Sequence, residues 1–226
     1  MSQPILEYEF RKQRFYFYEA PNTAALVSEI FSDNYKALSV GSTEFRPGDV
    51  ILDIGACEGV FSIMMARLFP FVRVVSMEAC PRTFFQMVRN IGLNGATNIE
   101  PHNIGAGKKR ERIPFSMCQD DHSGGGSAVM TFDPNLHTKI EVDVIGLDEA
   151  FEKFKIDRCR FLKIDIEGME YDVLYNSTVL PRVDFLGGEF HYNSKLDYDG
   201  RRPDGLVNWC LNQTKITFVE ACKMAE

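Results

Sequence analysis

The chain has 226 residues, a formal net charge of −7, 45% hydrophobic residues and 25% charged residues. Its length fits a single α/β domain, and its composition excludes an intrinsically disordered chain. The negative charge argues against broad binding to nucleic acid or to an anionic membrane surface, so we expect neither as a partner.

The N-terminus and the cysteines predict a cytoplasmic protein. Residues 1–9 contain no basic segment followed by an apolar one, and no uncharged apolar run reaches the length of a membrane span. The six cysteines form neither a CxxC pair nor a pattern with zinc-ligand spacing. In a chain of this size, scattered cysteines are typical of reduced thiols rather than of a disulfide framework.

Residues 1–48 form a mixed segment. Residues 16–18 predict a strand, residues 23–35 predict an amphipathic helix, and the pair Pro47-Gly48 predicts a closing turn. We expect this segment to lie on the substrate side of the domain that residues 49–226 form.

Strands and helices alternate regularly after residue 49. Pro81 stands where a helix tolerates proline best, at its first position. Such close alternation predicts right-handed crossovers and a doubly wound α/β fold with a mostly parallel sheet. The predicted strands are 50–54, 72–77, 98–104, 141–145, 161–165, 183–191 and 216–221, and the predicted helices are 59–69, 81–92, 148–154, 168–175 and 206–212.

Residues 110–131 interrupt this alternation. They contain the glycine-rich run 120–127 between two short predicted strands, 113–116 and 128–132. This pattern predicts an inserted hairpin with a mobile loop that covers the site, or else a surface hairpin without a role in binding.

The first predicted strand ends in the loop Asp53-Ile-Gly-Ala-Cys-Glu-Gly59. Ligands bind beyond the carboxyl ends of strands in such sheets, and glycines 55 and 59 allow a tight turn and a close approach to the backbone. A dinucleotide fingerprint requires glycine where Cys57 and Val60 stand. The acidic residues Asp53 and Glu58 would repel a pyrophosphate, whereas they suit the sulfonium and ammonium groups of S-adenosylmethionine. An ordinary strand-to-helix turn is the alternative.

Glu78 ends the second strand, 19 residues after Gly59. An acidic side chain at this position can accept hydrogen bonds from both ribose hydroxyls of a cofactor. Because NAD and S-adenosylmethionine both carry these hydroxyls, Glu78 alone does not separate the two.

A second informative stretch, residues 161–170, has the sequence Phe-Leu-Lys-Ile-Asp-Ile-Glu-Gly-Met-Glu. It brings Lys163, Asp165 and Glu167 to the carboxyl end of an apolar strand, where ionisable groups are costly unless they have a function or a partner. The structural alternative is helix capping by Asp165 or Glu167 together with an ion pair of Lys163.

The loop 53–59 and the stretch 162–170 together resemble the FkbM family of methyltransferases. The first element is common to many methyltransferases, whereas the second is close to a signature of this family, and the resemblance covers roughly residues 25–191. It implies a Rossmann-like class I methyltransferase fold, S-adenosylmethionine as the methyl donor, and O-methylation of a hydroxyl on a sugar or another natural product.

By position, the resemblance also implies the cofactor-binding residues. The methionine part would be held by the first loop, the ribose by the end of the second strand, and the adenine would lie against the end of the third strand. Two departures from the usual pattern concern this assignment. Many methyltransferases have glycine in place of Cys57, although relatives of this family often carry another residue there, and the usual acidic residue near the adenine is not present, so backbone groups of Asn103 or Ile104 would have to serve. The implied residues are Asp53, Gly55, Ala56, Cys57, Gly59, Glu78, Ala79, Asn103, Ile104 and Gly105.

Transfer of a methyl group to an alcohol needs a group that accepts the alcohol's proton. Asp165 ends the fourth strand of the sheet, and Glu189 and His191 end the next one. We expect His191 or Asp165 to be the base and Glu189 to orient the acceptor, although His191 could be a surface or core histidine and Glu189 a partner of Lys163 or an arginine. The same three residues suit a divalent metal, but their spacing does not demand one, and we assign no metal ligand.

The acceptor pocket is expected between residues 1–48 and the loop 120–127. Tyr16, Tyr18, Phe31 and Tyr35 could stack on a sugar there or pack in the core. A small molecule or a glycan is therefore the expected partner, while the acceptor's identity and the oligomeric state cannot be read from the sequence. Three alternatives stay open: an N-methyltransferase, a non-catalytic S-adenosylmethionine-binding partner protein and a nucleotide-linked oxidoreductase.

Overall fold

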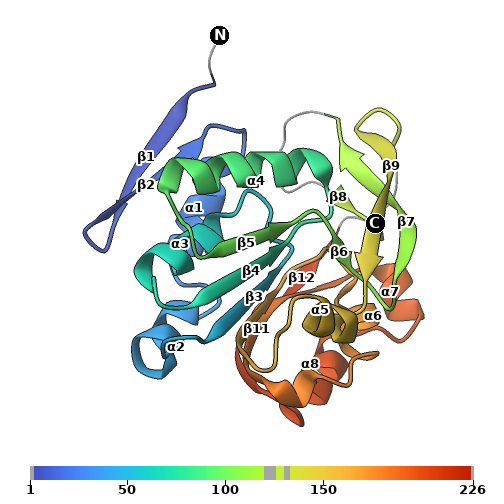
Figure 1. The fold of residues 1–226 in the computed structure, drawn as a ribbon. Coiled ribbons are helices and arrows are strands. Elements are labelled where there is room, and N and C mark those ends of the chain that lie inside the picture. The colour runs from blue at the N-terminus through green and yellow to red at the C-terminus, as the bar shows by residue number, and fades with distance from the viewer. Residues whose placement is uncertain (1–2, 120–125, 130–132, 225–226) are drawn as a thin grey trace.

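The computed structural model describes residues 3–119, 126–129 and 133–224, and its centre is a six-stranded sheet (Figure 1). All neighbouring strands of this sheet are parallel, so the predicted doubly wound α/β fold is confirmed. The strand order is β5 (Ile99–His102), β4 (Arg73–Met77), β3 (Val50–Ile54), β10 (Cys159–Ile164), β11 (Val183–Tyr192) and β12 (Lys215–Lys223). This is the strand order of Rossmann folds.

Helices cover both faces of the sheet. Ile51 and Phe161 face one buried cluster, and their neighbours Leu52 and Leu162 face the other. Because both faces are buried, these strands are continuous apolar runs, which is why the sequence predicts them well. The first cluster includes α1 (Thr23–Phe31), α2 (Ala37–Glu44) and α3 (Val60–Leu68), and the second includes α5 (Leu147–Lys153), α6 (Glu170–Leu174) and α8 (Pro203–Leu211).

The longest helix in the described part of the chain contacts β5 and α3, and two short helical segments flank β11. α4 (Pro81–Asn94) begins at the predicted proline and follows β4. The 3-10 turn η1 (Leu180–Arg182) leads into β11, and α7 (Ser194–Tyr198) follows it. α2 and α7 were not predicted, because both are short and α2 contains Gly41 in place of a regular apolar pattern.

The predicted inserted hairpin is present with a different second strand, and it belongs to a second sheet of four strands, seen beside the carboxyl edge of the main sheet in Figure 1. Its strands, in order, are β6 (Gly105–Ala106), β9 (His137–Ile145), β7 (Glu111–Cys118) and β8 (Gly126–Ser127). β7 pairs antiparallel with both β9 and β8, whereas β6 runs parallel to β9.

The strand predicted at 128–132 is wrong for Ala128 and Val129. The hydroxyl of Ser127 accepts a hydrogen bond from the Val129 amide (2.9 Å) and donates one to the Glu167 carbonyl (2.8 Å), so the chain bends there. The rest of that strand, residues 130–132, and most of the glycine-rich loop, residues 120–125, lie outside the described residues.

Two helix ends also differ from the prediction. α1 ends at Phe31 rather than at residue 35, because Asp33 has a φ of 60° and its carboxylate caps α2 by accepting from the Leu38 amide (2.8 Å). α6 begins at Glu170 rather than at residue 168, because Gly168 has a φ of 101° and cannot continue a helix.

The N-terminal strands β1 (Ile5–Phe10) and β2 (Gln13–Tyr18) form an antiparallel hairpin. Phe15 and Phe17 of β2 are fully buried in the same cluster as α1. Side chains of α4 bind the outer edge of β2: Asn94 pairs with both the amide (3.0 Å) and the carbonyl (2.6 Å) of Tyr16, and Asn90 accepts from the Tyr18 amide (2.9 Å). The side-chain amides of Asn90 and Asn94 thus make the backbone hydrogen bonds that a neighbouring strand would otherwise make.

The six cysteines are free thiols, as the sequence predicts. Within the described ranges, no helix combines the length and the apolar character that crossing a membrane requires.

The contact between α4 and β2 can be tested with Asn94→Ala. This change leaves the backbone of Tyr16 without its partner, and we expect it to lower the free energy of unfolding by about 1–3 kcal/mol. Urea unfolding measures the loss, and faster exchange of the Tyr16 amide hydrogen would localise it. Asn212→Ala, on an exposed helix end, is the matched control and should cost less than about 0.5 kcal/mol. Equal losses in the two variants would contradict this role of Asn94.

Candidate functional site

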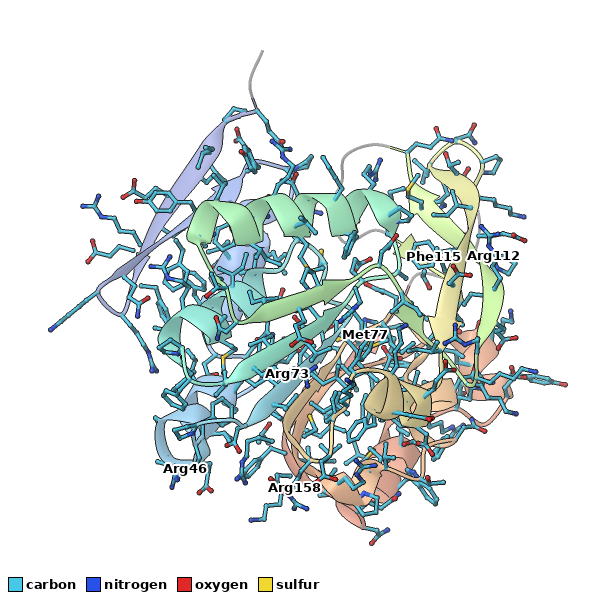
Figure 2. The ribbon with its side chains drawn as sticks, in the orientation of Figure 1. Arg46, Arg73, Met77, Arg112, Phe115 and Arg158 are labelled. Atoms are coloured by element: carbon cyan, nitrogen blue, oxygen red, sulfur yellow. The ribbon has the colours of Figure 1, made fainter. Side chains whose placement is uncertain are left out.

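A cavity of about 360 Å³ opens at the carboxyl edge of the main sheet, against the second sheet. Figure 2 labels one lining residue from each side, Met77 at the end of β4 and Phe115 on β7. The volume lies in the range of small-molecule sites. The lining residues are Asn22, Ala25, Leu26, Glu29, Gly55, Cys57, Met77, Glu78, Ala79, Cys80, Thr83, Gly105, Ala106, Ile113, Phe115, Gly126, Ala128, Val142, Val144, Asp165, Ile166, Glu167, Met169 and Glu189.

The loop after β3 forms the floor of this cavity. The amides of Gly55 and Ala56 both donate to the Met77 carbonyl (3.0 Å each), which fastens the loop to the end of β4. Gly55 has a φ of 79°, and a Cβ atom there would lie 1.9 Å from the Asp165 carbonyl oxygen. Only glycine fits this position, because it combines a left-handed backbone with direct contact to another chain segment.

Asp53 and Lys163 form a buried ion pair beneath the loop. They are register partners on the adjacent strands β3 and β10, and Lys163 Nζ lies 3.4 Å from Asp53 Oδ1 and 2.6 Å from the Gly55 carbonyl oxygen. The other carboxylate oxygen of Asp53 accepts from Ser62 (2.6 Å). Burial alone would lower the pKa of Lys163, but the carboxylates of Asp53 and Asp165 raise it, so the ammonium stays charged. Asp53 therefore supports the loop from below and does not line the cavity.

Glu78 lies at the opposite side of the loop. Its carboxylate accepts from the amides of Cys57 (2.9 Å) and Cys80 (2.8 Å), which fixes its orientation. Burial raises the pKa of Glu78, while these two hydrogen bonds oppose the shift. A carboxylate offers about four acceptor positions, so further hydrogen bonds remain available to a ligand in the cavity.

The end of the third strand contributes less than the sequence predicts. Gly105 lines the cavity, whereas the Asn103 side chain donates to the backbone carbonyls of Glu78 (2.9 Å) and Ala79 (3.1 Å). Ile104 packs against the hydrophobic core. Asn103 therefore holds the backbone that carries Glu78.

Acidic side chains gather at the far end of the cavity. Asp165 and Glu189 extend from neighbouring strand ends, and the Tyr35 hydroxyl lies 3.0 Å from Asp165 Oδ2 and 3.5 Å from Glu189 Oε1. Glu29 of α1 lines the same space. Burial, followed by the like charges of Glu189 and Asp165, raises the pKa of Glu29 to about 7. Burial and Asp165 likewise raise the pKa of Glu189.

His191 lies behind this acidic group, only 5% exposed, and does not line the cavity. Its Nδ1 atom lies 2.9 Å from the fully buried carboxylate of Glu170, which also accepts from the amides of Ile166 and Gly168 (3.0 Å each). Burial would lower the pKa of His191, but Glu170 and the nearby Glu167 outweigh this effect and raise it to about 9. A protonated imidazole has no lone pair with which to accept a proton.

The structure thus brings seven of the predicted site residues to one cavity: Gly55, Cys57, Glu78, Ala79, Gly105, Asp165 and Glu189. The other six lie outside its lining: Asp53, Ala56, Gly59, Asn103, Ile104 and His191. Of the aromatic residues proposed for the acceptor side, Tyr35 contacts Asp165, whereas Phe31 packs against Phe10 in a tilted arrangement and against Phe15 edge to face.

Comparison with known proteins identifies the family. A family model described as "Methyltransferase FkbM domain" matches residues 53–223, which is most of the chain. The chain belongs to the FkbM methyltransferase family. The resemblance drawn from the loop 53–59 and the stretch 162–170 is thereby confirmed.

Two curated relatives of this FkbM family chain are fungal proteins. "Methyltransferase 1" of Beauveria bassiana (strain ARSEF 2860) is 27% identical over 148 residues, 58% of this chain and 59% of that protein. "Methyltransferase sdnD" of Sordaria araneosa is 25% identical over 179 residues, 66% of each chain. The chain therefore spans about three fifths to two thirds of these relatives.

A solved structure, that of Trm5b from Pyrococcus abyssi, is 14% identical in sequence and matches with a TM-score of 0.40. The match covers 90% of this chain and 46% of the Trm5b chain. At this TM-score the likeness carries no argument about the site.

Sequence reasoning missed Glu29 and Glu170 in this FkbM family site, and it named Tyr35 without its contact to Asp165. Tyr35 lies 130 residues from Asp165, and no local pattern reports such a contact. Glu29 is on a predicted amphipathic helix whose polar face looks like an ordinary solvated surface. Glu170 carried a signal, because it ends the family motif, but its role depends on the turn at Ile166–Gly168 that its carboxylate closes.

The buried ion pair provides a test of the site's architecture. Lys163→Met leaves the Asp53 carboxylate buried with Ser62 alone, and we expect a loss of about 3–5 kcal/mol in the free energy of unfolding. In the double variant Asp53→Asn/Lys163→Met both charges are gone, so much of this loss should be recovered. Urea unfolding measures both, and Lys109→Met, on an exposed loop, serves as the control. Strictly additive losses would show that the two charges do not interact.

Proposed function

We propose that this chain transfers the methyl group of S-adenosylmethionine to a hydroxyl oxygen of a small molecule or glycan. Membership of the FkbM methyltransferase family supports the reaction class. The cavity between the loop after β3 and the end of β11 is the site where we place both substrates.

The main support for this proposal is the negative charge of the cavity. Its described lining contains five carboxylates, from Glu29, Glu78, Asp165, Glu167 and Glu189, and no lysine, arginine or histidine. A pyrophosphate would be repelled here, because none of the lining side chains offers a positive charge. The sulfonium and ammonium groups of S-adenosylmethionine are favoured by the same field, which argues for this cofactor over a dinucleotide.

The residues at the cavity fit the parts of this cofactor. Glu78 is oriented by two amides and retains acceptor positions for ribose hydroxyls. Gly55 and Cys57 line the cavity and would border the methionine part. Ile113, Phe115 and Val144 provide an apolar wall for a flat base. When bound, S-adenosylmethionine supplies an electrophilic methyl group.

The acceptor's proton requires a base next to the methyl group. Asp165 and Glu189 both line the cavity, and the Tyr35 hydroxyl lies 3.0 Å from the first carboxylate and 3.5 Å from the second. We assign proton acceptance to these two carboxylates rather than to His191, which is buried behind them with its pKa raised. This assignment differs from the sequence-based expectation. It keeps Asp165 as a base, gives Glu189 the same role in place of orienting the acceptor, and gives His191 no part in accepting the proton.

An amine acceptor or a non-catalytic role would leave a different signature. An amine needs less help from a base, so the rate of N-methylation would change little on loss of the Asp165 and Glu189 carboxylates. A protein that only binds S-adenosylmethionine would transfer no methyl group at all. We find no feature among the described residues that favours either alternative over O-methylation.

The test is a screen of hydroxylated metabolites and oligosaccharides with a radiolabelled methyl donor, followed by the variants Glu189→Gln and Asp165→Asn on the labelled acceptor. We expect each variant to lower kcat by about 10²–10⁴-fold while cofactor binding stays within a few-fold of the wild type. Glu152→Gln, an exposed carboxyl on α5, is the control and should be unchanged. Labelling of amines alone, with full activity of both variants, would refute the proposal.

A further inference from the structure

His191 is held in a geometry that leaves one ring nitrogen directed at acidic groups. The buried Glu170 carboxylate lies 2.9 Å from Nδ1 and is itself fixed by two backbone amides. Carboxylate–histidine pairs of this kind orient metal-binding imidazoles, because the carboxylate selects the ring nitrogen that stays free to bind the metal. In this chain the nitrogen that remains is Nε2.

Three carboxylate oxygens face Nε2. They belong to Glu167 (3.5 Å), Glu189 (3.6 Å) and Asp165 (3.9 Å), and these distances are longer than usual for an N–H···O hydrogen bond. Ligand atoms about 2.0–2.3 Å from one shared ion lie roughly 3–4 Å from one another. Ligand atoms of Asp165, Glu167 and His191 all lie within 4.8 Å of one another.

The local charge also favours a cation. The carboxylates of Asp165, Glu167, Glu170 and Glu189 all lie within 4 Å of a ring nitrogen of His191. Glu167 has a φ of 52°, a conformation that few residues other than glycine adopt, and it lines the cavity.

We propose that Asp165, Glu167 and His191 form a binding site for a divalent metal ion that accepts mixed oxygen and nitrogen ligands, such as Mn²⁺. One nitrogen and several carboxylate oxygens match the preferences of such an ion. The neighbouring Cys222 is not included, because its thiol donates to Glu189 (3.1 Å).

The metal's open positions would face the cavity, since Asp165 and Glu167 line it. There the ion would bind the acceptor hydroxyl and lower its pKa. Asp165 would then act as a metal ligand, and Glu189 alone would accept the proton. This step rests on the proposed function, whereas the metal site itself does not.

The site is tested by titrating the full-length chain, freed of metals with EDTA, with MnCl₂ and following free Mn²⁺ by electron paramagnetic resonance. We expect saturation at one ion per chain. Glu167→Gln should weaken binding by at least about tenfold, since even changes behind a metal ligand cost about 10- to 100-fold. Glu152→Gln is the matched control and should bind like the wild type. No saturable binding, or equal binding by the two variants, would overturn the proposal.

Thermal unfolding shows whether Glu167→Gln loses Mn²⁺ binding only because the variant is less stably folded. Glu167 is partly exposed, so Glu167→Gln should unfold near the wild-type temperature without metal. Mn²⁺ should raise Tm of the wild type and of Glu152→Gln, but not of Glu167→Gln. A rise in Tm shared by all three would also overturn the proposal. Because the titration contains no cofactor, its failure would leave the methyl-transfer proposal standing, and the reverse also holds.

Discussion

The buried ion pair between Asp53 and Lys163 is the constraint on which the rest of the site depends. It joins the carboxyl ends of the two central strands, and the same ammonium binds the Gly55 carbonyl and lies 3.8 Å from Asp165. Two charges at 0% and 4% exposure are stable only because each compensates the other. The pair thereby ties the loop that would carry the cofactor to the strand end that would carry the chemistry.

Above this pair, the site contains more negative than positive charge. The carboxylates of Glu29, Glu167 and Glu189 lie close enough for burial and mutual repulsion to raise their pKa values. Acidic groups with raised pKa values cluster at functional sites, where their destabilising effect is tolerated because the function needs them. A cationic cofactor at one end of the cavity and a divalent ion at the other would both relieve this repulsion, so the two proposals share one electrostatic origin.

Sequence predicted the parts of this arrangement that local patterns encode. The apolar runs of β3 and β10, Pro81 at the start of α4, and the acidic residues at the strand ends all have short-range signals. The second sheet was only partly foreseen, because β6 and β8 are two residues long and have no periodicity. Contacts such as that of Tyr35 with Asp165 arise from chain topology. The burial of Asp53 did carry a signal, since a lysine within a buried strand needs an anionic partner.

The central claim is that the acidic cavity selects a sulfonium cofactor. Isothermal titration calorimetry of the full chain with S-adenosylmethionine, and separately with NAD, tests it most directly. The account predicts saturable binding of S-adenosylmethionine at one molecule per chain and none of NAD at the same concentrations. Binding of NAD in preference to S-adenosylmethionine, or no binding of S-adenosylmethionine, would contradict it.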